Sequence, residues 1–298
     1  MENNLIQKQP IMSKVIYSLI PIYLFSLYFY GIYLVFLTVI VFVSGFFTEF
    51  IFEKIKGKKV SEALFVTCLL FTLSLPPKTP WWVAMIGIIF GVIFGKEIFG
   101  GFGKNIFNPA ILSRLFIYLT FPNQMKGFIK SINFGLTVDS ITAATPLKMI
   151  KAGESISTIK LLLGFNPGSM GEGFVILILL ALIYLVVTKT ASWQIIVSTI
   201  ASAGLLTVFL DLINIPNDFS SINYMLSGSL LFVAVFMATD PVSAPKKNIS
   251  RWIYGSIIGF TTIIIRTFSF PEGTSFAVLL GNTFASLLDE LFTKKVKE

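Results

Sequence analysis

Residues 227–245 read SGSLLFVAVFMATDPVSAP, an apolar run that stops abruptly before Pro241. A related stretch, SEALFVTCLLFTLSLPPKTPWW, occupies residues 61–82 and stops at Pro76-Pro77. Both apolar runs are shorter than the roughly 20 residues that a helix needs to cross a bilayer. In a membrane such helices are tolerated only where protein or a cavity covers the backbone groups freed by the break. We therefore expect two broken or half-spanning helices.

The same order of features recurs after each of these stretches. A helix with glycines four residues apart follows, at Gly87 and Gly91 in the first case and at Gly255 and Gly259 in the second. The next segments read GKNIFNPAIL and GTSFAVLL, and the offset between the two sets stays between 164 and 170 residues. This ordered recurrence favours an internal repeat over chance similarity between apolar helices. With five apolar segments per half, an odd number, the second half enters the membrane inverted.

The composition indicates that the solvent of this chain is lipid. Of its 298 residues, 55% are hydrophobic and 13% are charged, and the mean hydropathy is +0.83. These values predict an all-α polytopic membrane protein rather than a soluble domain. Ten apolar segments are expected, at 15–30, 32–52, 63–75, 81–99, 106–121, 174–187, 193–213, 225–238, 251–268 and 276–292. The predicted organisation is a first repeat (1–121), an outer-face loop (122–172) and a second, inverted repeat (173–298). The first apolar segment lacks a signal-peptidase-like site after it, so we expect a retained span.

The inventory of ligating residues excludes several classes of redox protein. The chain has no histidine and one cysteine, Cys68, which lies inside an apolar segment. Zinc sites, cysteine-ligated iron–sulfur clusters and histidine-ligated haem all need ligands that are absent here, so no metal site is predicted. If the protein moves electrons, an organic cofactor carries them.

The net charge of +8 is explained by membrane orientation rather than by nucleic-acid binding. The basic residues lie at the ends of apolar segments, where they set topology. Three clusters are Lys54, Lys56, Lys58 and Lys59, then Lys246, Lys247 and Arg251, then Lys294, Lys295 and Lys297. With ten spans these clusters share one face, so both termini are expected in the cytoplasm and the loop 122–172 outside.

That loop contains the sequence DSITAATPLK, residues 139–148. Thr145 before Pro146 predicts a helix cap with proline at the first helical position, and the helix would run over 147–152 and stop at Gly153. Free N–H groups at such a start suit a phosphate, and Lys148 lies one turn away. The local pattern by itself is equally compatible with an ordinary helix cap.

Asp139-Ser140-Ile141-Thr142-Ala143-Ala144-Thr145 resembles the flavinylation motif D-G-x-[S/T]-x-A-T, in which the last threonine carries FMN through a phosphoester. Serine stands at position 140 where glycine is usual. Three further stretches follow the same resemblance in order along the chain: KEIFGGFGKNIFNPA from Lys96, FMATDPVSAP from Phe236 and PEGTSFAVLLGNTF from Pro271. Together they resemble the RnfD subunit of the Rnf ion-translocating electron-transport complex and the homologous NqrB subunit of the sodium-pumping NADH:quinone oxidoreductase.

The resemblance implies a cofactor and its site. Covalent FMN is expected on Thr145, with Asp139, Thr142 and Lys148 around it. Asn105 and Asn108 are expected in the core, near flavin and ion paths. The resemblance also allows a further non-covalent flavin, without assigning its site. Gly100–Asn105 lacks the P-loop pattern and a preceding strand, so no nucleotide site is predicted in this segment.

The implied role is a flavin-carrying subunit of a translocase in a bacterial or archaeal cell membrane, coupling ferredoxin:NAD⁺ electron transfer to Na⁺ or H⁺ movement. No catalytic residue is assigned to this chain, because the substrate chemistry belongs to partners. The implied partners are the other membrane subunits, the flavin-carrying RnfG subunit, the iron–sulfur subunits and a flavin transferase. Two alternatives stay open: the quinone-reducing relative, disfavoured by the short N-terminal extension, and a non-redox channel or carrier.

Four ionisable residues lie within or against apolar segments, namely Glu62, Arg114, Asp240 and Asp289. Such residues are costly in hydrocarbon and usually face a partner or a hydrated path. Asp240 is the strongest ion-path candidate, because it lies at the break of a short helix; Glu62 and Asp289 are the others. Ser169 and Glu172 have the spacing of a capping box, which predicts a helix start there.

Overall fold

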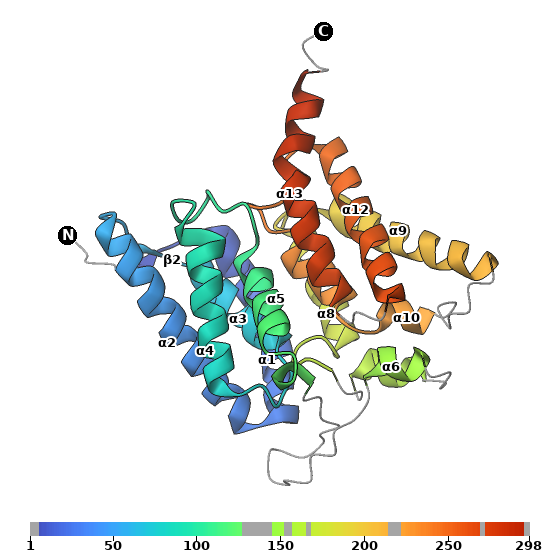
Figure 1. Cartoon of the computed structure of the whole chain (residues 1–298), viewed down its shortest axis with the longest axis horizontal. Helices are drawn as coiled ribbons and strands as arrows, with labels where there is room; N and C mark the ends of the chain where they lie inside the picture. Colours follow the sequence, from blue (N-terminus) through green and yellow to red (C-terminus); the bar gives the residue numbers. More distant parts are fainter. Residues whose placement is uncertain are drawn as a thin grey trace.

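The computed structural model describes residues 6–126, 145–151, 157–164, 168–213, 222–268 and 272–294. Two bodies of helices stand side by side (Figure 1). The first contains α1 (Pro10–Tyr30), α2 (Ile32–Ile55), α3 (Ala63–Ser74), α4 (Trp81–Val92) with its π-helical end η1 (Ile93–Glu97), and α5 (Pro109–Thr120). The second contains α8 (Val175–Val187), α9 (Trp193–Leu212), α10 (Ile222–Leu226), α11 (Leu230–Phe232) with its π-helical end η3 (Val233–Met237), α12 (Asn248–Thr267) and α13 (Gly273–Lys294). Short elements complete the described chain: strands β1 (Ile6–Gln7) and β2 (Val60–Ser61), a 3₁₀ turn η2 (Gln124–Lys126), α6 (Pro146–Lys151) and α7 (Thr158–Leu163).

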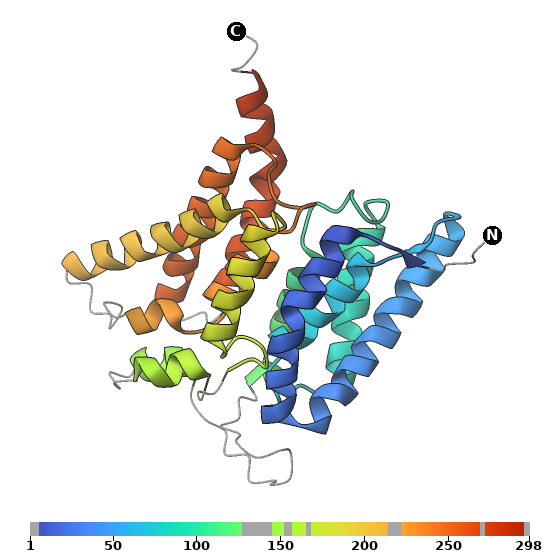
Figure 2. The ribbon, with the colours of Figure 1, turned by 180° about the vertical axis from the view of Figure 1, so that it is seen from behind.

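Corresponding helices of the two bodies run in opposite directions. In Figure 1, α4 ascends and α5 descends, whereas α12 descends and α13 ascends. In each body the fourth segment packs against the second and the fifth, α4 against α2 and α5 and α12 against α9 and α13. The predicted inverted repeat is therefore visible in helix direction and in packing. Figure 2 shows α1 and α8 side by side at the junction, where they are in contact.

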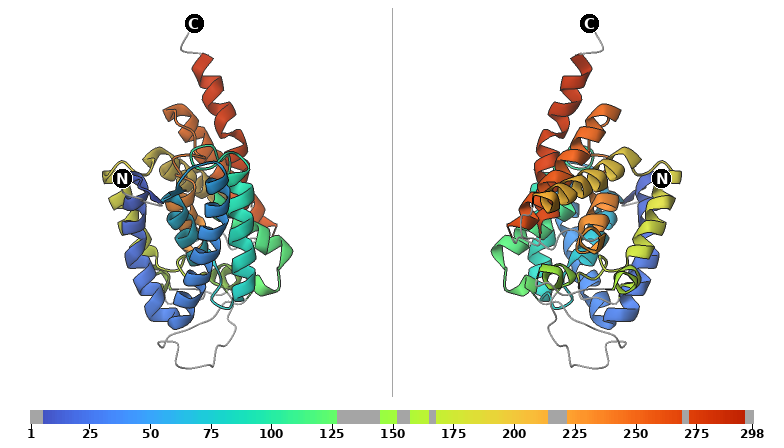
Figure 3. Two further views of the ribbon diagram at one scale, coloured as in Figure 1. Left: turned by 90° about the vertical axis from the view of Figure 1, so that its left-hand side faces the viewer. Right: turned by 90° about the vertical axis from the view of Figure 1, so that its right-hand side faces the viewer.

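Four helices among the described residues are long and apolar enough to cross a membrane: α1, α2, α9 and α13 up to Thr293. Shorter apolar helices, α3, α5 and α8, accompany them. The long helices carry large exposed side chains on their outward faces, such as Ile32 and Phe47 of α2 and Leu205 of α9. In water such faces would be costly, whereas in lipid they are not. The chain is a multi-pass membrane protein, and Figure 3 shows how its helices lie beside one another from two further directions.

The glycine pairs allow close helix packing, but against different neighbours in the two halves. A Cβ on Gly91 would collide with Ser113 of α5, so α4 approaches α5 closely. A Cβ on Gly255 or Gly259 would collide with Ser198 or Ser202, both of α9. The repeat is thus conserved in order and direction, while the helix that faces each glycine pair differs.

The two short helices end where the sequence predicts, but the second is subdivided. α3 ends at Ser74, just before Pro76-Pro77. The expected apolar segment 225–238 is split by a turn, because Gly228 adopts a left-handed φ of 72° between α10 and α11. Glycine reaches this conformation without steric cost, which explains why one apolar run becomes two short helices.

The predicted capping box at Ser169 and Glu172 is wrong. α8 begins later, at Val175, and its cap residue Phe174 makes no capping hydrogen bond through its side chain. The side chains of Ser169 and Glu172 instead contact Arg114. A buried guanidinium is a stronger partner for a carboxylate than a backbone N–H group.

Candidate functional site

Thr145 stands at the start of a short helix, as its sequence predicts. Its carbonyl accepts hydrogen bonds from the N–H groups of Lys148, at 2.8 Å, and Met149, at 3.0 Å. Proline at position 146 lacks an N–H and is therefore well suited to the first position of α6. Leu147 and Ile150 are buried against the second body of helices, while Lys148 is exposed. Asp139 and Thr142 lie outside the described residues.

Thr145 lines a pocket that we call the Thr145 pocket. Its other walls include Arg114, Glu172, Glu272, Gly168 and Gly228. The glycines leave bare backbone along the wall, and a Cβ on Gly168 would meet nothing within 4 Å. The pocket therefore combines an accessible hydroxyl-bearing residue, room beside the backbone and buried charges.

Arg114 joins three separate parts of the chain in this pocket. Its Nε and Nη2 lie 2.8 and 2.9 Å from the two carboxylate oxygens of Glu272, a paired geometry, and its Nη1 donates to Glu172. Nη2 also lies 3.4 Å from the Ser169 hydroxyl. All three charged side chains are at most 7% exposed. Burial raises the pKa of the Glu172 carboxyl, and the neighbouring guanidinium opposes that rise.

A second buried guanidinium lies behind the pocket wall. Arg266 of α12 is fully buried, and its Nη2 would be 3.1 Å from a Cβ on Gly228. The Nη2 of Arg266 lies 3.4 Å from the Thr274 hydroxyl, and its Cζ lies 5.6 Å from the ring centre of Tyr224. Sequence inspection singled out Arg114 but neither Arg266 nor Glu272. The signal was available for Arg266, because it lies inside the apolar segment 251–268 and an ionisable residue there requires a partner.

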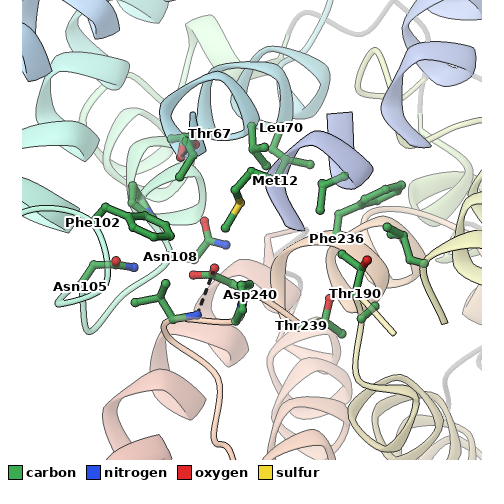
Figure 4. A pocket seen from close by; sticks show the side chains of 18 of the residues that line it. Met12, Thr67, Leu70, Phe102, Asn105, Asn108, Thr190, Phe236, Thr239 and Asp240 are labelled. Atoms are coloured by element: carbon green, nitrogen blue, oxygen red, sulfur yellow. Dashed lines mark hydrogen bonds between the residues drawn. The ribbon is translucent and has the colours of Figure 1, made fainter. Parts of the chain in front are cut away.

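Asn105, Asn108 and Asp240 meet in a second hollow, which we call the Asp240 cavity. Figure 4 shows their side chains converging, with Phe102 and Thr239 nearby. The structure thus brings together three candidates that are up to 135 residues apart in the sequence. Both amide and carboxylate groups face the same space.

Asp240 is half-buried and well supplied with donors. Its Oδ2 accepts from the Ser243 hydroxyl at 2.8 Å, and its Oδ1 accepts from the Val242 N–H at 3.4 Å. Burial raises the pKa of this carboxyl, whereas these hydrogen bonds counteract the rise. Donors of this kind favour the charged form, which is the form that attracts a cation.

Asn108 also caps a helix and joins the two halves of the molecule. Its side-chain oxygen accepts from the N–H groups of Ala110 and Ile111, which caps α5, and Pro109 takes the first helical position. Its Nδ2 donates to the carbonyl of Met237, at 3.2 Å, at the end of η3. One side chain therefore links the broken helix of the second half to the first half.

Glu62 and Asp289 do not line this cavity and instead hold chain segments. Glu62 accepts from the Gln9 N–H at 2.5 Å and from the Ser13 hydroxyl at 2.6 Å, which ties the N-terminal segment to the start of α3. Asp289 accepts from the N–H groups of Lys246 and Lys247 at 2.7 and 3.1 Å. Neither residue lines the cavity in the described part of the chain.

Sequence reasoning missed an ionic cluster beside the cavity, in which Lys56 is exposed and the other charged side chains are buried. Lys96, which lines the cavity, lies 2.5 Å from Glu49 and 2.6 Å from the Ser61 hydroxyl. Lys56 bridges Glu97 at 2.6 Å and Glu53 at 3.4 Å. The pair at positions 49 and 53 is one helical turn apart in an apolar helix, a spacing that could have identified it.

The pocket and the basic clusters lie at opposite ends of the molecule. In Figure 1, the end of α2, the start of α12 and the end of α13 share one end, which we call the lysine-rich end, and α6 lies at the other. This arrangement agrees with the predicted common face of the lysine clusters.

The fold and these sites define a class: a multi-pass membrane protein built from two opposed helical halves, with a charged pocket at one end and an amide- and carboxylate-lined cavity towards the other. The chain belongs to the NQR2, RnfD, RnfE family, whose sequence model matches residues 3–298. The resemblance read from the sequence motifs is thereby confirmed at the level of the family.

Individual relatives share more than a third of their aligned residues with this chain. It is 36% identical over 263 residues to the B subunit of the Na(+)-translocating NADH-quinone reductase of Azotobacter vinelandii, covering 84% of this chain and 64% of that protein. It is 38% identical to the protein of the same name from Ectopseudomonas mendocina, with the same coverage. The corresponding protein of Chromohalobacter salexigens is 37% identical over 279 residues, 90% of this chain and 66% of its own length. The chain therefore spans about two thirds of the length of these relatives.

Proposed function

We propose that this chain is the membrane-embedded, flavin-carrying subunit of an ion-translocating electron-transfer complex, with FMN joined to Thr145 through a phosphoester. One observation carries the proposal: the threonine that ends the motif DSITAAT also lines a pocket with a buried arginine and bare glycine backbone. Membership of a family whose relatives bear the name of a redox-driven sodium translocase gives independent support.

The Thr145 pocket has room for a bulky group, because a Cβ on Gly168 would meet nothing within 4 Å. The charge of Arg114 is already paired with Glu172 and Glu272, so the cation available to a phosphate is Lys148. Lys148 is exposed one turn along α6, where it can face a phosphate. Asp139 and Thr142 belong to the same motif and complete the proposed attachment sequence.

Bound FMN supplies a centre that accepts and releases electrons, singly or in pairs. The chain contributes attachment through the Thr145 oxygen, orientation through the pocket walls, and a fixed electrostatic environment through Arg114, Glu172 and Glu272. Because these charged groups are buried, their field acts on a bound group with little screening by water.

We place the ion path in the Asp240 cavity. Asp240 offers a carboxylate held by hydrogen bonds, and the amide oxygen of Asn105 is a further ligand type for a hard cation. The amide oxygen of Asn108 already caps α5, so Asn108 positions this part of the cavity wall. Glu62 and Asp289 remain secondary candidates, because both are already engaged in holding backbone segments. A non-covalent flavin near Asn105 and Asn108 is the second cofactor proposed for this chain, on the motif resemblance.

The reaction type is proposed from the relatives. Their names favour transfer from NADH to a quinone coupled to Na⁺ movement. The motif resemblance to the RnfD subunit supports the second candidate, ferredoxin:NAD⁺ transfer coupled to Na⁺ or H⁺. In either case the substrates react on partner subunits, and a flavin transferase installs the FMN. Both termini are proposed to lie in the cytoplasm, with Thr145 on the outer face.

The proposal is tested by comparing Thr145→Val with Thr158→Val, the same substitution at the start of α7. Membranes from cells that express a flavin transferase are resolved on a denaturing gel and imaged for flavin fluorescence. The wild type and Thr158→Val should fluoresce at the position of this chain, and Thr145→Val should not. Equal fluorescence of all three proteins would refute attachment at Thr145, and no fluorescence in any would refute covalent flavin.

A further inference from the structure

A basic groove opens at the lysine-rich end, between the turn that follows α8 and the loop that precedes α12. Its walls include Lys189, Lys246 and Arg251 together with the apolar residues Ile11 and Trp193. The groove adjoins the Asp240 cavity, because Thr190, Ala191, Thr239, Asp240 and Pro241 line both. Of the two neighbouring hollows, the groove carries the larger number of basic side chains.

Backbone conformation and hydrogen bonds place the three basic residues at this groove. Lys189 has a left-handed φ of 55°, and its exposed side chain projects from the tight turn that ends α8. Lys246 is exposed, while its backbone N–H is fixed by Asp289. Arg251 donates from Nε to the carbonyl of Pro245 at 3.2 Å, which fixes its guanidinium to the loop that precedes α12.

Negative charge near the groove does not outweigh these cations. Among the described lining residues the one carboxylate is Asp240, which is half-buried and accepts hydrogen bonds from Ser243 and Val242. Asp289 does not line the groove and accepts hydrogen bonds from the backbone N–H groups of Lys246 and Lys247. Lys14, whose Nζ lies 3.4 Å from the carbonyl of Thr188, adds a further positive charge beside the turn. The groove therefore favours an anion at its mouth.

Tryptophans mark the depth of the groove in the membrane. Trp193 begins α9, and Trp252 is the fifth residue of α12; their rings meet edge to face with centres 5.6 Å apart. Their side chains are 49% and 40% exposed. Half-exposed tryptophans at the ends of apolar helices are typical of the level of lipid headgroups. Lys189, Lys246 and Arg251 thus lie at the level where lipid phosphates are found.

We propose that this groove binds the phosphate of an anionic membrane phospholipid, with Lys189, Lys246 and Arg251 around the headgroup. Its acyl chains lie along the apolar rim that Ile11 and Trp193 begin and that the outer face of α8 continues. Basic pockets between membrane helices bind anionic headgroups because charge attraction and chain burial act together. The site does not depend on the covalent flavin.

The test uses the purified full-length protein, within its complex where that is the purified form, in mild detergent. Bound lipids are counted by native mass spectrometry during titration with phosphatidylglycerol or with phosphatidylcholine. The wild type should retain phosphatidylglycerol preferentially. Lys189→Gln/Lys246→Gln/Arg251→Gln should lose that preference, with affinity falling about fivefold for each cation removed.

Matched variants separate charge from folding. Lys126→Gln/Lys148→Gln/Lys160→Gln removes three lysines elsewhere in the chain and should bind phosphatidylglycerol as the wild type does. Because Arg251 also braces a loop, the double variant Lys189→Gln/Lys246→Gln provides a second test that spares it, and Lys189→Arg/Lys246→Arg should preserve binding. Unchanged phosphatidylglycerol binding in the triple and double groove variants would overturn the site, as would equal retention of phosphatidylcholine by the wild type.

Competition distinguishes a lipid from a soluble phosphate. Glycerol 3-phosphate or inorganic phosphate is added at the concentration of lipid that fills the site. The bound phosphatidylglycerol should remain, because the acyl chains contribute to its affinity. Its complete displacement would show that the groove selects a free phosphate, which contradicts the lipid proposal.

Discussion

Replacing Arg114 by methionine should destabilise the protein strongly, because it leaves Glu172 and Glu272 buried without their cation. Both carboxylates are 7% exposed, and the contacts of Arg114 reach three of their four oxygens. Removing one partner of a buried ionic group costs about 3–5 kcal/mol. At the lower conversion of about 2 °C per kcal/mol for a chain of this size, the apparent Tm should fall by about 6–10 °C.

The assay is thermal unfolding followed by intrinsic tryptophan fluorescence, at one detergent concentration and one scan rate, because membrane proteins often unfold irreversibly. Arg251→Met is the matched control. Arg251 is half-buried, and its guanidinium donates to a carbonyl rather than to a carboxylate, so its loss should cost below about 1 kcal/mol.

A compensating variant tests the cause of the loss. Arg114→Met/Glu172→Gln/Glu272→Gln removes the stranded charges and should recover at least about half of the lost stability, since uncharged groups cost less to bury. The reasoning is refuted if the fall in apparent Tm caused by Arg114→Met is no larger than the fall caused by Arg251→Met. It is also refuted if the triple variant is less stable than Arg114→Met, because buried charge would then not be the cause.

Three further predictions concern the ion path, the packing and the topology. Asp240→Asn keeps the side-chain size but removes the charge, so a flavinylated complex should retain its covalent flavin and lose most of its cation dependence in vesicles; normal pumping would move the path elsewhere. Gly255→Val forces a side chain into the contact between α12 and α9 and should cost at least about 3 kcal/mol of stability, read as a lower Tm, whereas an unchanged Tm would contradict the close packing. Cysteines placed at Lys58 and Lys246 should react only with reagent that enters the cytoplasm and one at Lys148 only from outside; labelling of all three from one side would refute the topology.

Helix order and helix breaks were predictable from the sequence because they depend on local chemistry. Pro76-Pro77 ends α3, and Pro146 starts α6, since proline acts on its own neighbours. The inverted order of the halves followed from an odd number of segments. The split between α10 and α11 was not predicted, because a left-handed glycine inside an apolar run leaves no periodic signal.

The sites were predictable only in part, because charge partners come from distant segments. Asn105, Asn108 and Asp240 were each identified separately, and the structure shows that they share one cavity. The capping-box interpretation of Glu172 failed, because the spacing to Ser169 is local whereas its true partner, Arg114, is 58 residues away. Motif spacing reports on neighbours along the chain and does not report on ion pairs between helices.

The most direct test of the central claim is the mass of the peptide that contains Thr145. The protein is purified from cells with an active flavin transferase, digested and analysed by tandem mass spectrometry with fragmentation across the residues 139–148. The account predicts that this peptide carries the mass of one FMN joined with loss of water, with fragments that assign it to Thr145 rather than to Thr142. The account would be contradicted if every copy of this peptide lacked FMN, or if the FMN group were assigned to another residue.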